Sequence, residues 1–310
     1  MAEARPEAPV LDEALLAAVA AVAREGSFER AARALHITPS AVSQRVKLLE
    51  ERLGAVLIVR GQPCSATEIG ARICRHAELV AVLVSELRRE LPMLPRDSPA
   101  APHSSLRIAV NADSLSTWFI GAMQDFGRED AALLNLTLAD EDHTAEWLRR
   151  GHVLGAVTSV GTAVQGCRIR RLGSLRYLAT ASPSFLQRWF PAGVCADALA
   201  RAPSLLFDSN DRLQELWARR IVRREVALPA HRIPSTQGFI DAALAGVGWG
   251  MNPLSLVRPQ IKSGTLVELV PDSPVDVPLY WQATRLKVPV LERLTRSVVR
   301  AAAAALQPPS

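Results

Sequence analysis

A stretch rich in proline and serine divides the chain and limits what each part can fold into. Residues 92–105 read PMLPRDSPAAPHSS, with four prolines and three serines. Proline lacks the backbone N–H that helices and sheets need and restricts the residue before it, so the stretch predicts a hinge linker. Before it, apolar residues recur only at helical spacing; after it, short β-rich runs alternate with amphipathic helices. The sequence therefore predicts an all-α module followed by an α/β domain.

The first module has the spacing and the cap residues of three short helices. They are predicted over residues 11–24, 28–35 and 39–53. Ser27 and Thr38 are good N-caps, and Gly54 can end the third helix in the left-handed conformation. That helix turns Val42 and Val46 inward and a polar face outward. Two short helices, a tight turn and a third helix of this kind are the helix-turn-helix arrangement, whose outer face reads base edges in the DNA major groove.

The candidate DNA-binding residues start the third helix, lie on its polar face or follow it in the chain. They are Thr38, Pro39, Ser40, Ser43, Gln44, Arg45, Lys47 and Arg60. Most of their side chains can hydrogen-bond to base edges or pair with phosphates. The segment from Arg30 to Arg60 contains six basic residues and two acidic ones. This local excess of positive charge attracts phosphate more strongly than the whole-chain net charge of +5 suggests. On spacing alone, the alternative is an ordinary three-helix bundle with a solvated polar face.

The residues of this segment resemble the LysR-type transcriptional regulators. The run FERAARALHITPSAVSQRVKLLEERLGAVLIVR, followed by TEIG at residues 67–70, is similar to the winged helix-turn-helix of that family. The resemblance implies that residues 57–59 form a wing strand and that Arg60 lies near the adjacent DNA backbone or minor groove. It also implies a domain order: winged helix-turn-helix over 1–66, linker helix over 67–91, hinge linker over 92–105 and effector-binding domain over 106–310.

A long amphipathic helix is predicted over residues 67–91. Its apolar residues recur every three or four positions, and the candidate dimerisation seam is Ile73, Val80, Val84 and Leu87. On spacing alone, such a helix could instead pack on its own domain. The resemblance implies that it pairs antiparallel with a second subunit, so that a homodimer or homotetramer presents two reading heads to one operator.

The second domain is predicted to begin as a βαβαβ unit with a parallel sheet. Strands are predicted over residues 106–110, 134–139, 153–158, 204–207 and 280–283, with a closing helix over 288–306. The order and lengths resemble the two-lobed, periplasmic-binding-protein-like α/β fold that LysR-type regulators carry. The resemblance implies a first lobe over about 106–172 and 279–310 and a second over about 173–278. Ligands of such folds lie at the carboxyl ends of strands, against helix N-termini.

Acidic and hydroxyl residues gather at these predicted strand ends. The candidate effector-binding residues are Asp113, Ser114, Ser116, Thr117, Asp140, Glu141, Asp142, Asp208, Ser235 and Thr236. Helix N-termini favour an anion and carboxylates favour a cation, a combination that suits a basic amino acid. In this interpretation Ser114, Ser116 and Thr117 hold the α-carboxylate. On chemistry alone, the same residues are also typical of ordinary helix caps and solvated acids.

A second, narrower resemblance bears on the effector. The run VNADSLSTW at residues 110–118 is similar to the LysR-type subgroup that controls lysine and arginine export, and LRRG at 148–151 and GAVT at 155–158 agree with it. The resemblance implies lysine or arginine as effector and an amino-acid exporter gene as target. Residues 207–212, which read FDSNDR, and residues 234–241 differ in detail from the subgroup. A LysR-type regulator with a different effector therefore stays an alternative.

The sequence contains none of the motifs that would indicate another class of protein. It contains no HExxH, G-x-S-x-G or G-x-G-x-x-G, so we expect no enzyme, no cofactor and no metal site. The four cysteines lack metal-ligand spacing and favour a reduced, cytoplasmic chain, with a regulatory Cys167–Cys195 disulfide as the alternative. We expect neither an export signal nor a membrane span, because the apolar run at 15–23 is shorter than the ~20 residues a span needs. An architectural protein that binds chromosomal or replication-origin DNA stays the other alternative.

Overall fold

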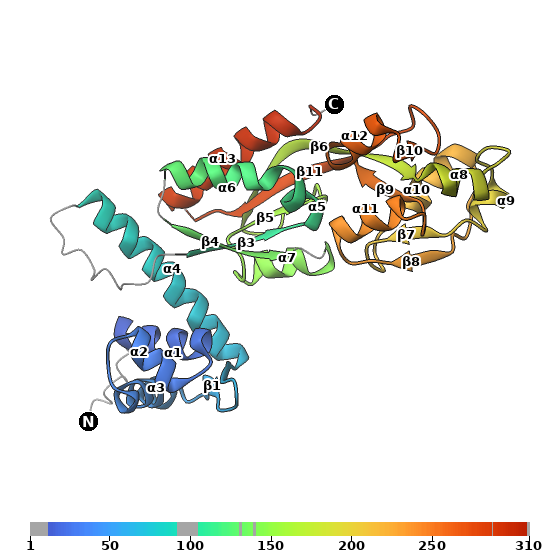
Figure 1. Ribbon diagram of the computed structural model, residues 1–310. Coiled ribbons are helices and arrows are strands. Elements are labelled where there is room, and N and C mark those ends of the chain that lie inside the picture. The colour runs from blue at the N-terminus through green and yellow to red at the C-terminus, as the bar shows by residue number, and fades with distance from the viewer. Residues whose placement is uncertain (1–11, 92–104, 130–131, 139–140, 287, 309–310) are drawn as a thin grey trace, which may run out of the picture. The chain divides into compact units, whose positions relative to one another are not determined.

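The chain divides by its contacts into two units, Met1–Leu106 and Arg107–Ser310. The computed structural model describes residues 12–91, 105–129, 132–138, 141–286 and 288–308. The hinge linker predicted over 92–105 lies, apart from Ser105, outside the described residues. Figure 1 colours the first unit from blue to teal and the second from green to red.

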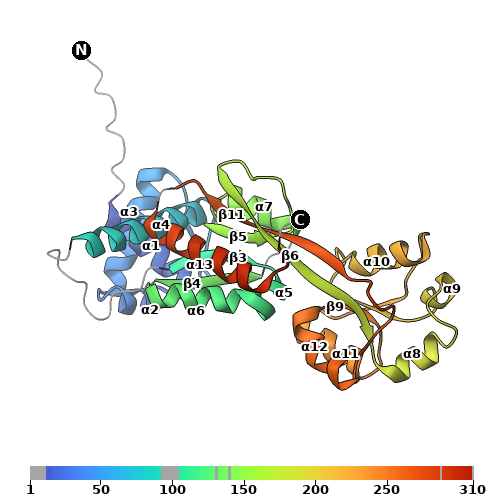
Figure 2. The ribbon, with the colours of Figure 1, turned by 90° about the horizontal axis from the view of Figure 1, so that it is seen from above.

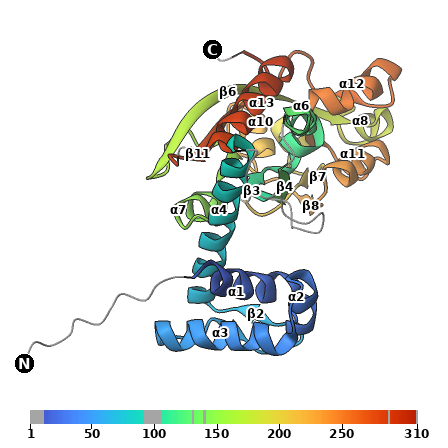
Figure 3. The ribbon, with the colours of Figure 1, turned by 90° about the vertical axis from the view of Figure 1, so that its left-hand side faces the viewer.

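Four helices and a small wing make up the described part of the first unit (Figure 3). The elements are α1 (Glu13–Glu25), α2 (Phe28–Ala34), α3 (Pro39–Leu53), β1 (Ile58–Val59), β2 (Ser65–Ala66) and α4 (Glu68–Glu90). Each helix is capped by a side-chain oxygen that accepts a first-turn N–H, from Asp12, Ser27, Thr38 and Thr67. β1 pairs antiparallel with β2, which confirms the wing strand expected at 57–59.

One apolar core holds this unit together. Its buried residues come from all four helices and the wing and include Leu16, Val19, Ala31, Val42, Val46, Leu49, Leu57, Ile58 and Cys74. α3 therefore buries the stripe that its spacing predicts and leaves its polar face open to solvent. The contact between α4 and the wing requires glycine at position 70, since a Cβ there would lie 1.9 Å from the Leu57 carbonyl oxygen.

A sheet shared by two lobes organises the second unit. The first lobe contains β3 (Ser105–Val110), α5 (Ala112–Ser114), a π-helical turn (Leu115–Phe119), α6 (Ile120–Glu129), β4 (Leu133–Leu138), α7 (Glu141–Arg149), β5 (Gly155–Thr158) and α13 (Pro289–Ala305). The described strands follow the order β10-β6-β11-β5-β3-β4, and β3 pairs parallel with β5 as the βαβαβ pattern predicts. α6 and α13 cover one face of the sheet and α7 the other (Figure 1).

Two long strands join the lobes. β6 (Cys167–Ala181) and β11 (Val275–Thr284) pair antiparallel along most of their length, and Figure 2 shows both running from one lobe to the other. The sequence predicts crossings between lobes near these segments but only a short strand at 280–283. The register shifts between Leu279 and Tyr280, so β11 has an irregularity where it passes between the lobes.

The second lobe surrounds the far ends of these strands. It contains α8 (Pro183–Trp189), α9 (Ala196–Leu199), β7 (Ser204–Leu206), α10 (Leu213–Val222), β8 (Ala230–Arg232), α11 (Thr236–Leu244), β9 (Gly250–Pro253), α12 (Leu254–Ser263) and β10 (Val267–Glu268). The predicted strand at 204–207 is β7, and it pairs with β8. Trp217 and Trp249 pack in the core with ring centroids 5.2 Å apart, and the Trp217 indole donates to the Ser273 carbonyl. β9 and β10 both pair with β6 and tie the lobe to the sheet.

The cysteines are free thiols in this structure. Cys167 is buried and Cys195 is exposed, so the disulfide raised as an alternative by the sequence is not formed. Within the described ranges, no cluster of histidine, cysteine or acidic residues has an arrangement that could hold a metal ion. No helix in that part of the chain is both long enough and apolar enough to span a membrane.

Candidate functional sites: the polar face of α3 and the interlobe cavity

The polar face of α3 presents hydrogen-bonding side chains to solvent. Ser40, Gln44 and Lys47 are exposed, whereas Ser43 and Arg45 are half-buried. Lys47 forms an exposed i,i+4 ion pair with Glu51 at 3.6 Å. Exposed pairs of this kind contribute little to stability, so Lys47 can exchange its partner for a phosphate.

Two of the candidate residues instead fix the start of the helix. The Thr38 hydroxyl accepts from the Ala41 N–H at 3.2 Å and shares a hydrogen bond with the Ser40 hydroxyl at 3.0 Å. Pro39 occupies the first turn, where its missing N–H costs nothing. Thr38 and Pro39 are exposed and therefore still lie on the surface that the helix start presents.

The wing is fastened to α3 by a residue that the sequence analysis did not single out. One carboxylate oxygen of Glu50 accepts from the backbone N–H groups of Leu57 at 2.7 Å and Ile58 at 3.2 Å. The Arg60 guanidinium lies over the Phe28 ring, 5.3 Å from its centroid. These contacts hold the wing and Arg60 in a fixed relation to the helix-turn-helix.

The predicted seam on α4 splits into two parts. Ile73 packs against the core of its own unit, which is the alternative that spacing left open for this helix. Val80 and Val84 are half-buried and Leu87 is 48% exposed. Leu83, Leu87 and Leu91 are all exposed at a spacing of four residues, and such a group of apolar side chains on one face of a helix favours a covering surface.

A cavity of about 510 Å³ lies between the two lobes of the second unit. It is lined by the loop after β3, by β6, β9 and β11, by the loop between β7 and α10, and by the start of α11. Its volume lies within the range of about 300–1,000 Å³ that is usual for small-molecule sites. The lining mixes apolar side chains such as Phe239 and Met251 with a small number of charged ones.

Asp113 is a half-buried residue whose carboxylate is enclosed at the wall of this cavity. Its two carboxylate oxygens accept hydrogen bonds from the Tyr177 hydroxyl at 2.7 Å and from the Thr236 hydroxyl at 3.0 Å. Asp113 belongs to the first lobe and Thr236 to the second, so this contact joins the lobes. Burial raises the pKa of Asp113 against the opposing effect of both hydrogen bonds, and the carboxylate of Asp211 adds to the rise.

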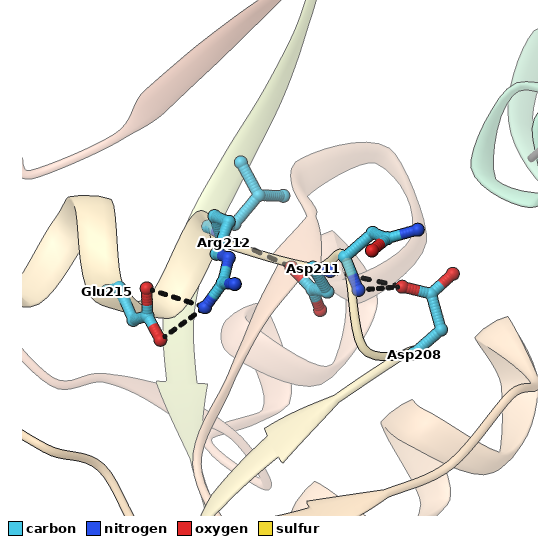
Figure 4. A network of polar contacts seen from close by, with 6 residues as sticks. Asp208, Asp211, Arg212 and Glu215 are labelled. Carbon is cyan, nitrogen blue, oxygen red and sulfur yellow. Dashed lines mark hydrogen bonds and ion pairs between the residues drawn. The ribbon is translucent and has the colours of Figure 1, made fainter. Parts of the chain in front are cut away.

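The loop between β7 and α10 contributes two further carboxylates (Figure 4). Asp208 accepts from the backbone N–H groups of Asn210 at 2.7 Å and Asp211 at 3.1 Å, so it shapes the loop. Asp211 accepts from the backbone N–H groups of Phe207 and Leu213 at 2.9 and 3.1 Å. Burial raises the pKa of Asp211, and the neighbouring Asp208 adds to the rise.

The charges on the cavity wall are predominantly negative. Its described lining contains Asp113, Asp208, Asp211 and Asp276 against Arg212, which gives four negative formal charges, one positive and a net −3. The Arg176 guanidinium binds Asp276 through two contacts of 2.8 Å and holds the pKa of that carboxyl below its usual value. Asp113, Asp208 and Asp211 have no ion pair with a basic side chain among the contacts of the described chain.

Among the candidates of the second unit whose side chains the structure describes, Ser114, Ser116, Thr117 and Ser235 do not line the cavity. Ser116 is exposed, and the Thr117 hydroxyl donates to the Asp113 carbonyl within its own helix at 2.6 Å. Ser114 is fully buried, and Ser235 caps α11 by accepting from the Gly238 N–H. Ser116 and Thr117 lie in a π-helical turn over 115–119, which directs their side chains differently from a regular helix.

The side chains of the predicted acidic run after β4 lie outside the described part of the structure. Asp140 lies outside the described residues, and so do the side chains of Glu141 and Asp142 at the start of α7. Four other lining residues, Tyr177, Asn252, Arg212 and Asp276, were not among the candidates. Arg212 belongs to the segment 207–212 discussed above, and Asp276 precedes the predicted strand at 280–283. Tyr177 and Asn252 reach the cavity from β6 and β9, which no local sequence pattern predicted.

Two family models match the chain. The one described as "Bacterial regulatory helix-turn-helix protein, lysR family" covers residues 14–71. The one described as "LysR substrate binding domain" covers residues 99–303. Together they span both units.

Known proteins are similar to this chain over almost its whole length. It is 45% identical over 298 residues to the HTH-type transcriptional regulator LysG of Mycobacterium tuberculosis, across 96% of this chain and 95% of the relative. The crystal structure of ArgP from Mycobacterium tuberculosis matches with a TM-score of 0.77 and 43% identity, across 96% of this chain and all of that one. Full-length LysG from Corynebacterium glutamicum with bound effector Arg matches with a TM-score of 0.66 and 38% identity, across 96% of this chain and all of that one.

Proposed function

The chain belongs to the LysR family of bacterial transcriptional regulators, and we propose that a basic amino acid, lysine or arginine, binds between its two lobes and controls its action on a promoter. It is a DNA-binding regulator and not an enzyme. Our proposal includes an amino-acid exporter gene as target and a cytoplasmic location, where a DNA-binding regulator meets its operator. It also includes the domain boundaries at 66/67, 91/92 and 105/106.

The observation that carries this proposal is the meeting of two carboxylates from opposite lobes. Asp113 comes from the first lobe and Asp211 from the second, and both line the same cavity. Burial raises the pKa of Asp113, and the charge of Asp211 adds to the rise. A cation between them removes this repulsion and compensates a carboxylate that burial has deprived of water. The bound effector Arg in the related Corynebacterium protein supports the choice of a basic amino acid.

Binding can also alter the relation between the lobes. The Asp113–Thr236 hydrogen bond joins them at 3.0 Å. A cationic group that contacts Asp113 and Asp211 adds a second connection between the same lobes. A ligand shifts a conformational equilibrium only by its differential affinity for the two states, so the contacts that span the lobes are the ones that matter.

The DNA contacts follow from the first unit. We propose that Ser40, Ser43 and Gln44 approach base edges in the major groove, while Lys47 pairs with phosphate. Arg60 lies over Phe28, and we propose that it contacts the adjacent DNA backbone or minor groove. Val80, Val84 and Leu87 would then meet a second copy of α4 in a homodimer, which presents two such heads to one operator.

A thermal-shift screen of the full-length protein against the twenty amino acids tests the effector class. A ligand that binds only the folded state stabilises it by about 2.7 kcal/mol at 100 times its Kd, which raises the melting temperature clearly. We expect the largest shifts with lysine and arginine. Shifts confined to acidic or aromatic amino acids would contradict the proposal, while membership of the LysR family would be unaffected.

A further inference from the structure

An amino acid brings a carboxylate into a cavity that is already negative. That carboxylate needs a partner, because an unpaired charge in a desolvated site is costly. The hydroxyls predicted for this role do not line the cavity: Ser116 is exposed and Thr117 donates to its own helix. Ser114 is also absent from the lining. The α-carboxylate therefore requires a different partner.

Arg212 is the cationic residue of the described cavity lining. It directly precedes α10, next to Asp211. Its Nη1 donates to both carboxylate oxygens of Glu215, at 3.0 and 3.2 Å (Figure 4). The Arg212 side chain is 70% exposed and that of Glu215 50%, so water screens this ion pair and it contributes little to stability.

The neighbours of Arg212 fit an α-amino-acid head group. Such a head group carries an ammonium and a carboxylate on one carbon, so its receptor must place opposite charges side by side. The loop supplies Asp211 directly before Arg212 and Asp208 earlier in the same loop, and all three line the cavity. A guanidinium carries five N–H donors in a planar fork that matches a carboxylate, and both bonds to Glu215 use a single nitrogen.

We propose that Arg212 binds the α-carboxylate of the effector and exchanges Glu215 for it when the cavity is filled. This inference rests on the proposed function, since it assumes an amino-acid effector. Glu215 competes with the effector for Arg212, so it weakens binding and holds the guanidinium when the cavity is empty. Asp208 then faces the α-ammonium, and Asp113 and Asp211 face the cation of the side chain.

Calorimetry of the full-length protein with L-lysine and L-lysinamide tests this exchange. The two ligands share their cationic groups, but lysinamide lacks the carboxylate. We expect the wild type to prefer lysine by about 10- to 100-fold, as for one charge-assisted pair. Arg212→Gln should lose this preference by weakening lysine alone. Glu215→Gln should strengthen lysine several-fold and leave lysinamide unchanged.

A matched control lies on the same helix. Arg219 on α10 is exposed, pairs with Glu225 at 3.7 Å and does not line the cavity, so Arg219→Gln should change neither ligand. An Arg212→Gln variant that keeps the wild-type preference for lysine, or that weakens both ligands equally, overturns the role of Arg212 and leaves the basic effector standing. If the wild type binds neither ligand nor arginine, the proposed function itself fails, and the role of Arg212 fails with it.

Discussion

Replacing Asp113 by asparagine removes one buried charge from the cavity and keeps the size of the side chain. The amide oxygen still accepts from one of the two hydroxyls of Tyr177 and Thr236, and the other hydroxyl can turn to accept from the amide NH₂. The variant therefore separates charge from shape. Bound lysine loses one charge-assisted contact, about 1.5–3 kcal/mol, and we expect its affinity to fall by about 10- to 100-fold.

The same substitution should affect folding stability with the opposite sign. Burial raises the pKa of Asp113 in the folded protein above the value of about 3.9 that an unfolded chain has. The folded state then holds the proton more tightly, so stability falls as the pH rises from the unfolded value through the raised one. Asparagine carries no charge. We therefore expect Asp113→Asn to be at least as stable as the wild type at pH 7 and to lack that fall.

Two measurements on one variant check these effects. Calorimetry with lysine at pH 7 gives the affinity, and urea unfolding between pH 4 and pH 7 gives the stability. Thr236→Val is the matched control, because it removes one donor to the carboxylate and keeps the charge. Wild-type affinity for lysine in Asp113→Asn refutes the contact between Asp113 and the cation. A variant less stable than the wild type at pH 7 refutes the argument from burial.

Three further predictions concern DNA, assembly and pH. Gln44→Ala should relax base preference at one position per half-site, at a cost of about 1–3 kcal/mol in binding free energy. Lys47→Ala should weaken binding to all DNA sequences alike and make it less dependent on salt. An unchanged binding-site logo for Gln44→Ala contradicts the assignment of this face of α3 to DNA reading. Val80→Glu with Val84→Glu should give monomers that lose operator binding, and sedimentation that shows an intact dimer contradicts the seam. Lysine affinity should decrease as the pH falls through the raised pKa of Asp113, because the protonated carboxyl no longer attracts a cation. Calorimetry at a series of pH values measures the affinity, and an affinity that does not change with pH contradicts the prediction.

The first unit could be predicted from the sequence because its signals are local. Ser27 and Thr38 cap the helices that they were expected to cap, and the apolar stripe of α3 is buried as its spacing requires. The second unit was less predictable where distant segments decide the structure. β6 reads CRIRRLGSLRYLATA, which lacks regular alternation, and it is extended because it pairs with β11, about a hundred residues later in the chain.

The candidate site was predictable only in part for the same reason. Asp113, Asp208 and Thr236 line the cavity, and each follows or caps an element that the sequence shows. Ser114, Ser116 and Thr117 do not, and the last two lie in a π-helical turn where the prediction assumed a regular helix. Tyr177 reaches Asp113 across 64 positions, a pairing that no local pattern indicates.

Titration of the full-length protein with L-arginine and with L-citrulline tests the central claim most directly. Citrulline matches arginine closely in size but carries an uncharged side chain, so the comparison isolates the cation that Asp113 and Asp211 are proposed to bind. We predict saturable heat with arginine or lysine and at least about tenfold weaker binding of citrulline, the effect of one charge-assisted pair. Equal affinity for arginine and citrulline, or binding of an anionic or aromatic compound with no heat from the basic amino acids, would contradict a basic effector between the lobes.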